Sequence, residues 1–291
     1  MNPILLKPTL KTLIWGTEQW GISAHPNGDD EVLNEEYLGK TLSALWKDNP
    51  ELFGNAEGDR FPLLTKIIEA NTDLSIQVHP VDEYAAKNEN GSLGKTECWY
   101  IMDAKQGATI VIGHNAVNKT EVKSMIENGQ WKDFIREIPV KKGDFFFIEP
   151  GTVHAIKGGT TILETQQSSD ITYRVYDYDR LQNGKPRQLH VKQSIDVINA
   201  PFVQKKPPKN DAISIGAVKQ LVSCGFFTVW HGDVNNELVI NQNRPFLLCS
   251  IIAGECKLDT ILFKQGDHFI LPFNYGSAFF RGNAEIIFSS I

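Results

Sequence analysis

Several features are scarce in this sequence of 291 residues, and each absence argues against a class of protein. No apolar run approaches the roughly 20 residues that a membrane-spanning helix needs, so we expect no contact with a membrane. The N-terminal stretch MNPILLKPTLKTLIWG is broken by prolines and lysines and lacks a small-residue cleavage site, so it does not resemble a signal peptide. The formal charge of −6 provides no long basic face for a phosphate backbone, which argues against binding of nucleic acid. A small anionic substrate stays compatible with this charge, because it needs only a local cluster of cations.

Cysteine is also scarce. The four cysteines show neither C-x-x-C spacing nor the density of a disulfide scaffold; they are Cys98, Cys224, Cys249 and Cys256. Reduced, buried thiols are typical of a cytoplasmic protein, and we expect that location.

Helical patterns are few, and short apolar segments separated by Gly, Asn and Pro dominate the chain. The segments that predict strands are SIQVH, ECWYIM, ATIVIG, DFFFIE, TTILE, ITYRVY, FFTVWHG, ELVIN, FLLCSII and EIIFSS. Many short strands with frequent turn signals indicate a sandwich or barrel, with jelly rolls among the choices. We expect helices as inserts over 60–71, 120–137 and 189–200. The Pro- and Lys-rich stretch 204–211 predicts a linker.

One segment is repeated. KKGDFFFIEPG (141–151) is similar to KQGDHFILPFNYG (264–276), and AIKGGTTILE (155–164) is similar to FFRGNAEIIF (279–288). We therefore predict two copies of one β-barrel motif, the second shorter and one residue out of step. His154 falls opposite Ala278, which suggests that one copy carries chemistry and the other is scaffold.

Four residues form a candidate metal site. Strand alternation in SIQVHP (75–80) places Gln77 and His79 on one face. Glu97 begins the strand ECWYIM, and His154 follows the Pro-Gly turn after FFFIE. Two histidines, a carboxylate and a carboxamide oxygen would hold a divalent transition metal and leave a coordination position open.

From these residues alone, an alternative in which they bind no metal is about equally well supported. A lone strand histidine is more often a hydrogen-bonded polar group than a ligand, and Glu97 and Gln77 could be surface groups. The aromatic residues Trp15, Trp99, Tyr100 and Phe145–Phe147 are expected in the core. The four candidate ligands leave the metal open between zinc and iron.

The same segments carry a resemblance to a known family. PGTVH after a Gly-Asp strand resembles the second motif of the cupins, although Gln77 replaces a histidine of the first motif and a long insert separates His79 from Glu97. These departures are themselves features of the type I phosphomannose isomerases. The similarity covers nearly the whole chain and is carried by 61–80, 89–102, 143–156 and 164–180, with LIWG (13–16) at the N-terminus. The segment LGKTLSALWK (38–47) departs from the Gly-Glu-x-Trp-x-x-Ser pattern expected nearby.

The resemblance implies a fold and a site. The fold would be mainly β, with two cupin-type jelly-roll β-barrels and helical insertions in the N-terminal part. Residues 1–203 would form the catalytic cupin domain, and residues 209–291 a second, metal-free one. One Zn²⁺ per chain would be bound by Gln77, His79, Glu97 and His154. Arg174 would be an essential active-site residue, and Lys95 would lie close to the substrate.

The function implied is the interconversion of D-mannose 6-phosphate and D-fructose 6-phosphate through an enediol or enediolate. Charge placed in advance in a dry site stabilises such an anion. Without the family, the favoured interpretation of Arg174 in ITYRVYDYDR is a surface residue paired with Asp177 or Asp179, and Lys95 could be an exposed loop lysine.

Two other functions stay open. His79, Glu97 and His154 also match the two-His, one-carboxylate set of iron oxygenases, although Gln77 would fill a position that oxygen needs. A non-catalytic sugar- or metal-binding module is the third candidate. The sequence leaves open the oligomeric state, the phosphate-binding residues, the proton-transferring base and the pathway served.

Overall fold

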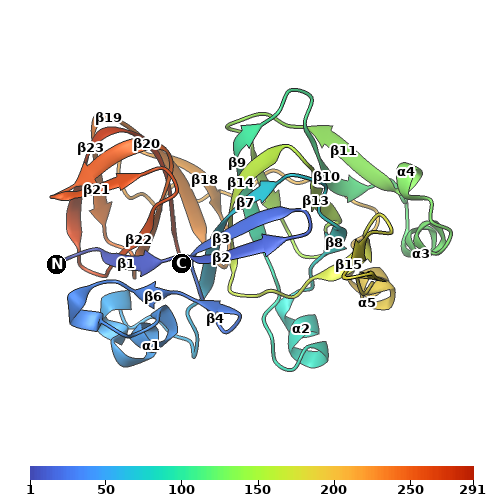
Figure 1. The fold of residues 1–291 in the computed structure, drawn as a ribbon, viewed down its shortest axis with the longest axis horizontal. Helices are drawn as coiled ribbons and strands as arrows, with labels where there is room; N and C mark the ends of the chain where they lie inside the picture. Colours follow the sequence, from blue (N-terminus) through green and yellow to red (C-terminus); the bar gives the residue numbers. More distant parts are fainter. The chain divides into compact units, whose positions relative to one another are not determined.

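The computed structural model describes residues 1–291, and strands dominate it (Figure 1). None of its helices is long and apolar enough to cross a membrane. The chain divides into two compact units. Unit 1 contains Met1–Lys11, Gln19–Ile67 and Pro207–Ile291, and unit 2 contains Thr12–Glu18 and Ile68–Lys206. Unit 2 ends inside the stretch predicted as a linker, while the assignment of 1–203 to one catalytic domain stays a prediction.

Unit 1 is built on one large antiparallel sheet with the order β18-β19-β23-β20-β22-β1-β6, to which β21 adds by pairing with β20. Its strands are β1 (Ile4–Lys7), β6 (Glu31–Val32), β18 (Lys219–Ser223), β19 (Thr228–Gln242), β20 (Leu247–Leu258), β21 (Ile261–Lys264), β22 (His268–Leu271) and β23 (Gly276–Ser290). The smaller elements are β4 (Ala24–His25), β5 (Gly28–Asp29), η1 (Glu35–Tyr37), α1 (Leu42–Asp48) and η2 (Pro50–Phe53). Alternate residues of the long strands bury an apolar face, which includes Ile240, Leu247, Ala278 and Phe288.

Unit 2 holds a five-stranded antiparallel sheet with the order β11-β10-β13-β8-β15. A second sheet has the order β12-β9-β14-β7-β3-β2, and the residues of β2, β3 and β7 are divided between the two units. The strands of these sheets are β2 (Thr9–Leu13), β3 (Gly16–Ile22), β7 (Leu63–Ala70), β8 (Ile76–Val78), β9 (Glu97–Ala104), β10 (Thr109–His114), β11 (Ile135–Pro139), β12 (Phe145–Ile148), β13 (His154–Ile156), β14 (Thr160–Gln167) and β15 (Tyr173–Tyr176). The remaining elements are the pair β16 (Leu181–Gln182) and β17 (Lys185–Pro186) and the helices α2 (Asp82–Asn88), α3 (Lys119–Glu127), α4 (Trp131–Phe134) and α5 (Val191–Val197).

The predicted strands are present, and the mainly β class is confirmed. The predicted helix over 189–200 is confirmed as α5, and the segment 120–137 contains α3 and α4 but ends in strand β11. The predicted helix over 60–71 is wrong, because Leu63–Ala70 forms strand β7. Most side chains of β7 are buried on both faces, so its apolar run does not show the alternation that would have distinguished it from a helix.

The two copies of the internal repeat form matching turns. The Lys141 N–H donates to Asp144 Oδ2 at 2.9 Å, and the Lys264 N–H donates to Asp267 Oδ2 at 2.8 Å. Gly143 and Gly266 both adopt a positive φ, of 87° and 92°. This left-handed conformation favours glycine, which explains why both copies contain Gly-Asp.

The three phenylalanines 145–147 are only half-buried, whereas Ile148 is fully buried. They form β12, which is the edge strand of its sheet, so one side of the strand lacks a neighbour. The expectation that all three lie in the core is therefore wrong. Trp99 on the adjacent strand β9 is fully buried, as predicted.

Candidate metal centre and active site

The four predicted metal ligands converge in unit 2. Gln77 on β8 pairs directly with His154 on β13, and the side chains of such cross-strand partners leave the sheet on the same face. His79 follows β8 directly, and Glu97 opens β9. The metal-binding atoms of His79, Glu97 and His154 all lie within 4.8 Å of one another, and their side chains are buried.

The two imidazoles are oriented by main-chain carbonyls. Nδ1 of His79 lies 2.7 Å from the carbonyl oxygen of Ile171, and Nδ1 of His154 lies 2.9 Å from that of Thr152. A carbonyl oxygen only accepts, so each Nδ1 carries the proton and each Nε2 is left with a lone pair. Ligating histidines commonly make this second hydrogen bond, because it fixes the tautomer and the ring orientation.

The Nε2 atoms of His79 and His154 lie 3.1 Å apart, and both face the Glu97 carboxylate at 3.4 and 3.3 Å. Two lone pairs and a carboxylate at these distances repel one another unless a cation lies among them. The Gln77 amide nitrogen lies 3.3 Å from His154 Nε2, and a half-turn of the amide places its oxygen there instead. This donor set fits a divalent metal ion.

Charge at the centre is unevenly distributed. Burial lowers the pKa of His79 to about 3, with a further contribution from the Lys95 charge, and burial also lowers the pKa of His154. Burial by itself would raise the pKa of Glu97, but the Lys95 ammonium, 2.7 Å from Oε2, holds it well below its usual range. The histidines are therefore neutral and the carboxylate ionised, which is the protonation state that metal binding requires.

Lys95 is buried, with 4% of its side chain exposed, so the reading of an exposed loop lysine is wrong. It precedes β9 by two residues, and its main-chain N–H donates to the Pro80 carbonyl. Its Nζ lies 3.3 Å from His79 Nε2 and 3.4 Å from Glu164 Oε1. Lys95 is thus the side-chain cation of this centre.

Arg174 lies on β15, directly opposite Gln77, so Arg174, Gln77 and His154 form one row across three strands. Its Nη1 donates to the Gln188 carbonyl at 2.9 Å, while Nε is buried without a hydrogen-bond partner. Burial and the charge of Arg187 lower the pKa of Arg174. The alternative pairing with Asp177 is not present as a salt bridge, because that carboxylate accepts from Arg180 and Arg187.

Comparison with known proteins identifies the family. Residues 7–102 match the model of the type I phosphomannose isomerase catalytic domain, and residues 217–291 match that of the mannose-6-phosphate isomerase cupin domain. The chain is 45% identical to mannose-6-phosphate isomerase ManA of Bacillus subtilis, over 100% of this chain and 99% of that protein. The chain belongs to the type I phosphomannose isomerase family.

Two further family members support this assignment. Mannose-6-phosphate isomerase of Streptococcus mutans is 43% identical over 99% of this chain and 98% of that protein. The crystal structure of mannose 6-phosphate isomerase from Bacillus subtilis matches with a TM-score of 0.94 at 43% identity, covering 100% of both chains.

Glu164 is a member of this centre that sequence reasoning missed. Its side chain is buried, Oε2 accepts from the Trp99 indole N–H at 2.9 Å, and Oε1 faces Lys95. The sequence predicts that TTILE is a strand, but it does not predict the strand register. That register places Glu164 opposite Trp99, which lies 65 positions away in the chain.

A second group of metal-ligating side chains lies on β19 and β23 of unit 1. Its members are His231, Asp233 and Glu285. Nε2 of His231 faces Glu285 at 3.4 Å, whereas Nδ1 faces Asp233 at 3.8 Å. This group differs from the centre of unit 2 in its exposure, since the Asp233 side chain is 62% exposed, and exposed acidic groups are common without a metal ion.

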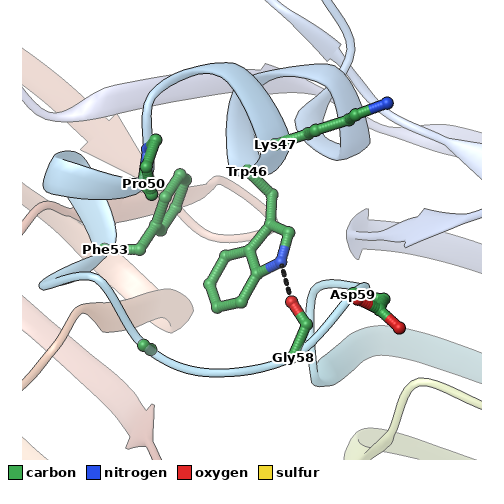
Figure 2. A pocket seen from close by; sticks show the side chains of 7 residues that line it. Trp46, Lys47, Pro50, Phe53, Gly58 and Asp59 are labelled. Atoms are coloured by element: carbon green, nitrogen blue, oxygen red, sulfur yellow. Dashed lines mark hydrogen bonds between the residues drawn. The ribbon is translucent and has the colours of Figure 1, made fainter.

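Unit 1 also contains a cavity of about 430 Å³, shown in Figure 2. Its lining residues are Trp46, Lys47, Pro50, Phe53, Ala56, Gly58 and Asp59. The Trp46 indole N–H is already bonded to the Gly58 carbonyl at 3.1 Å, and the charged residues of the lining, Lys47 and Asp59, are exposed. This cavity is therefore lined by no buried ionisable side chain, in contrast to the centre of unit 2.

Proposed function

We propose that this protein interconverts D-mannose 6-phosphate and D-fructose 6-phosphate through an enediol or enediolate. The observation that carries this proposal is the buried pair of Nε2 lone pairs facing Glu97 in a chain of the type I phosphomannose isomerase family. The isomerisation moves one hydrogen from C2 to C1 and leaves the composition of the sugar unchanged. Its intermediate carries negative charge on oxygen, and the centre has cations nearby.

We propose that one Zn²⁺ per chain binds to Gln77, His79, Glu97 and His154. When bound, a metal ion with one anionic ligand supplies positive charge that polarises sugar oxygens. The fit of the site supports binding of a borderline divalent ion, since imidazole nitrogens and a carboxylate are typical zinc ligands.

Lys95 would hold a fixed positive charge beside the substrate oxygens. Its ammonium lies 2.7 Å from the carboxylate of Glu97 and 3.4 Å from that of Glu164, and both carboxylates are buried. A charged group held in a water-poor site stabilises an oxyanion more strongly than the same group in water.

Arg174 would bind the enediolate or the phosphate of the substrate. Its place in the row with Gln77 and His154 supports contact with a molecule held at the centre, and its unpartnered Nε is a donor that such a molecule could satisfy. A guanidinium offers two parallel donors to either group.

We also propose that the repeated motif belongs to two cupin-type jelly-roll barrels, of which the one in residues 209–291 binds no metal. The matching Gly-Asp turns and the 0.94 TM-score to the Bacillus subtilis structure support this architecture.

The deciding experiment is a coupled assay of fructose 6-phosphate formation by the purified, zinc-replete protein. Turnover of mannose 6-phosphate is expected, and its absence would refute the proposal. Arg174→Ala should abolish turnover while the bound zinc, measured by elemental analysis, stays at one per chain. Wild-type turnover in Arg174→Ala would remove Arg174 from the active site and leave the rest of the proposal standing.

A further inference from the structure

Arg174 lies on an edge strand of its sheet. Strand β15 is the last strand of the five-stranded sheet, with β8 on one side and no strand on the other. The main-chain N–H and C=O groups of an edge strand alternate between the neighbouring strand and the open side. Those on the open side need partners from elsewhere in the fold.

His190 supplies both partners for Arg174. The Arg174 N–H donates to Nδ1 of His190 at 3.2 Å, and the His190 N–H donates to the Arg174 carbonyl at 2.8 Å. Both main-chain groups of Arg174 therefore point away from β8. Arg174 and Gln77 are consequently a non-hydrogen-bonded cross-strand pair, the class in which the two Cα atoms, and hence the side chains, are closest.

The imidazole of His190 is used for this contact although it stands at the start of a helix. His190 is the N-cap residue of α5, yet its side chain makes no capping hydrogen bond. The helix packs against β15, and Figure 1 shows the two side by side. Two residues earlier, the Gln188 carbonyl accepts from the Arg174 guanidinium, so residues 188–190 hold both ends of Arg174.

We propose that His190 is a positioning residue for the isomerase reaction, whose neutral Nδ1 fixes the backbone of Arg174 and thereby keeps the guanidinium in the row with Gln77 and His154. This inference rests on the proposed role of Arg174. Nδ1 accepts only while it carries no proton, because a doubly protonated imidazole has no lone pair.

The surroundings of His190 keep it neutral. Burial and the Arg174 charge lower its pKa, against an opposing contribution from Glu89. The Tyr173 ring lies 6.1 Å away, and its hydroxyl donates to Glu89 at 2.9 Å. Burial and Glu89 raise the pKa of Tyr173, so this neighbour remains uncharged at neutral pH. As the pH falls through the lowered pKa of His190, the bond to the Arg174 N–H is lost, and kcat/KM should fall with it.

The test compares His190→Asn with His190→Ala in the zinc-replete enzyme. Asparagine places Oδ1 where histidine has Nδ1, and this oxygen accepts a hydrogen bond at any pH between 5 and 9. His190→Ala should lower kcat/KM about ten-fold, the effect of one lost hydrogen bond in an active site, whereas His190→Asn should restore most of it. In His190→Asn, the fall of kcat/KM at acid pH should lack the contribution from protonation of His190. Bound zinc should stay at one per chain in both variants.

A second pair of variants separates this inference from the proposed function. His190→Ala added to Arg174→Lys should cost no further activity, because both changes act on the same guanidinium. If Arg174→Ala is inactive but His190→Ala keeps the wild-type kcat/KM, the role of His190 is refuted and that of Arg174 stands. A His190→Asn variant as slow as His190→Ala, or a full ten-fold loss on top of Arg174→Lys, would refute it too. Wild-type turnover in Arg174→Ala would refute the role of Arg174 and, with it, that of His190.

Discussion

The two copies of the repeated motif share a backbone but differ in the side chains on one face. In unit 2, Ile148 of β12 pairs with Glu97, and in unit 1 the corresponding Leu271 pairs with Leu247. The same comparison sets Ala278 opposite His154, and both are buried. The copy in unit 2 thus carries ionisable groups where the copy in unit 1 is apolar.

The neighbouring strands show the same difference between the two units. Trp99 pairs with Glu164 in unit 2, whereas Cys249 pairs with Phe288 in unit 1. Ile240 pairs with Ala278, where unit 2 has Gln77 paired with His154. The motif therefore folds without any of these polar groups. Since buried charges cost desolvation energy, their presence in unit 2 reflects a function other than stabilising the strands.

The largest expected effect comes from making unit 2 resemble unit 1 at a single position. In His154→Ala, the residue of the second copy replaces a proposed ligand. Loss of even an outer partner of a ligand costs about 10–100-fold in metal affinity or activity, so kcat/KM should fall at least ~100-fold. Elemental analysis should show less bound zinc. His231→Ala in unit 1 is the control and should keep full zinc, and unchanged zinc in His154→Ala would reject it as a ligand.

The converse change should destabilise unit 1. Leu247→Glu places a carboxyl group in a fully buried apolar position with no cation provided, which should cost about 3–5 kcal/mol of unfolding free energy. The measurement is the urea midpoint. Leu262→Glu is the matched control, because Leu262 on β21 is 52% exposed and its substitution should change stability by less than about 0.5 kcal/mol. Equal midpoints for the two variants would contradict the view that the interior of unit 1 excludes charge.

A smaller effect concerns a buried histidine at a repeat position in unit 1. His268 corresponds to Phe145, its Nδ1 lies 2.8 Å from Ser250 Oγ, and Nε2 is buried without a partner. Burial lowers its pKa to about 4, from an ordinary value of 6.5. Between pH 6.5 and 4 the unfolded chain therefore binds the proton first, so native stability should fall by up to about 3 kcal/mol over this window, and the contribution is absent above pH 6.5.

Urea midpoints at pH 7.5 and 5 would test this for wild type and His268→Phe. The variant should lose less stability on acidification than wild type does. An identical change in both proteins would show that His268 does not contribute to acid sensitivity.

The smallest expected effect is at the glycine that faces this ring. A Cβ added at Gly21 would lie 2.1 Å from the nearest atom of His268, so Gly21→Ala should cost about 1–3 kcal/mol. His268→Ala in the same chain should recover part of that loss, because the ring is then gone. Gly225→Ala, where nothing lies within 4 Å, is the control. Additive costs of the two single changes would show that the two residues are not in contact.

The sequence predicted the parts of this fold that depend on local pattern. Strand segments, the repeat and the position of His154 after a Pro-Gly turn are all local, and the structure brings the four predicted ligands together. The strand β7 was misread as a helix because a run buried on both faces has no period. The role of Glu164 was not predicted, because its contact with Trp99 depends on the register between two strands. The role of His190 was not predicted, because its contact with Arg174 depends on how α5 packs against β15. A single sequence reveals neither.

The bonds between His190 and the edge strand also bear on solution behaviour. A sheet edge with free N–H and C=O groups is a template on which another chain can add as a strand. At Arg174 both of these groups are already taken by residue 190, and the helix that follows lies against the same strand. The segment that orients the guanidinium therefore also closes this edge of the sheet against intermolecular strand pairing.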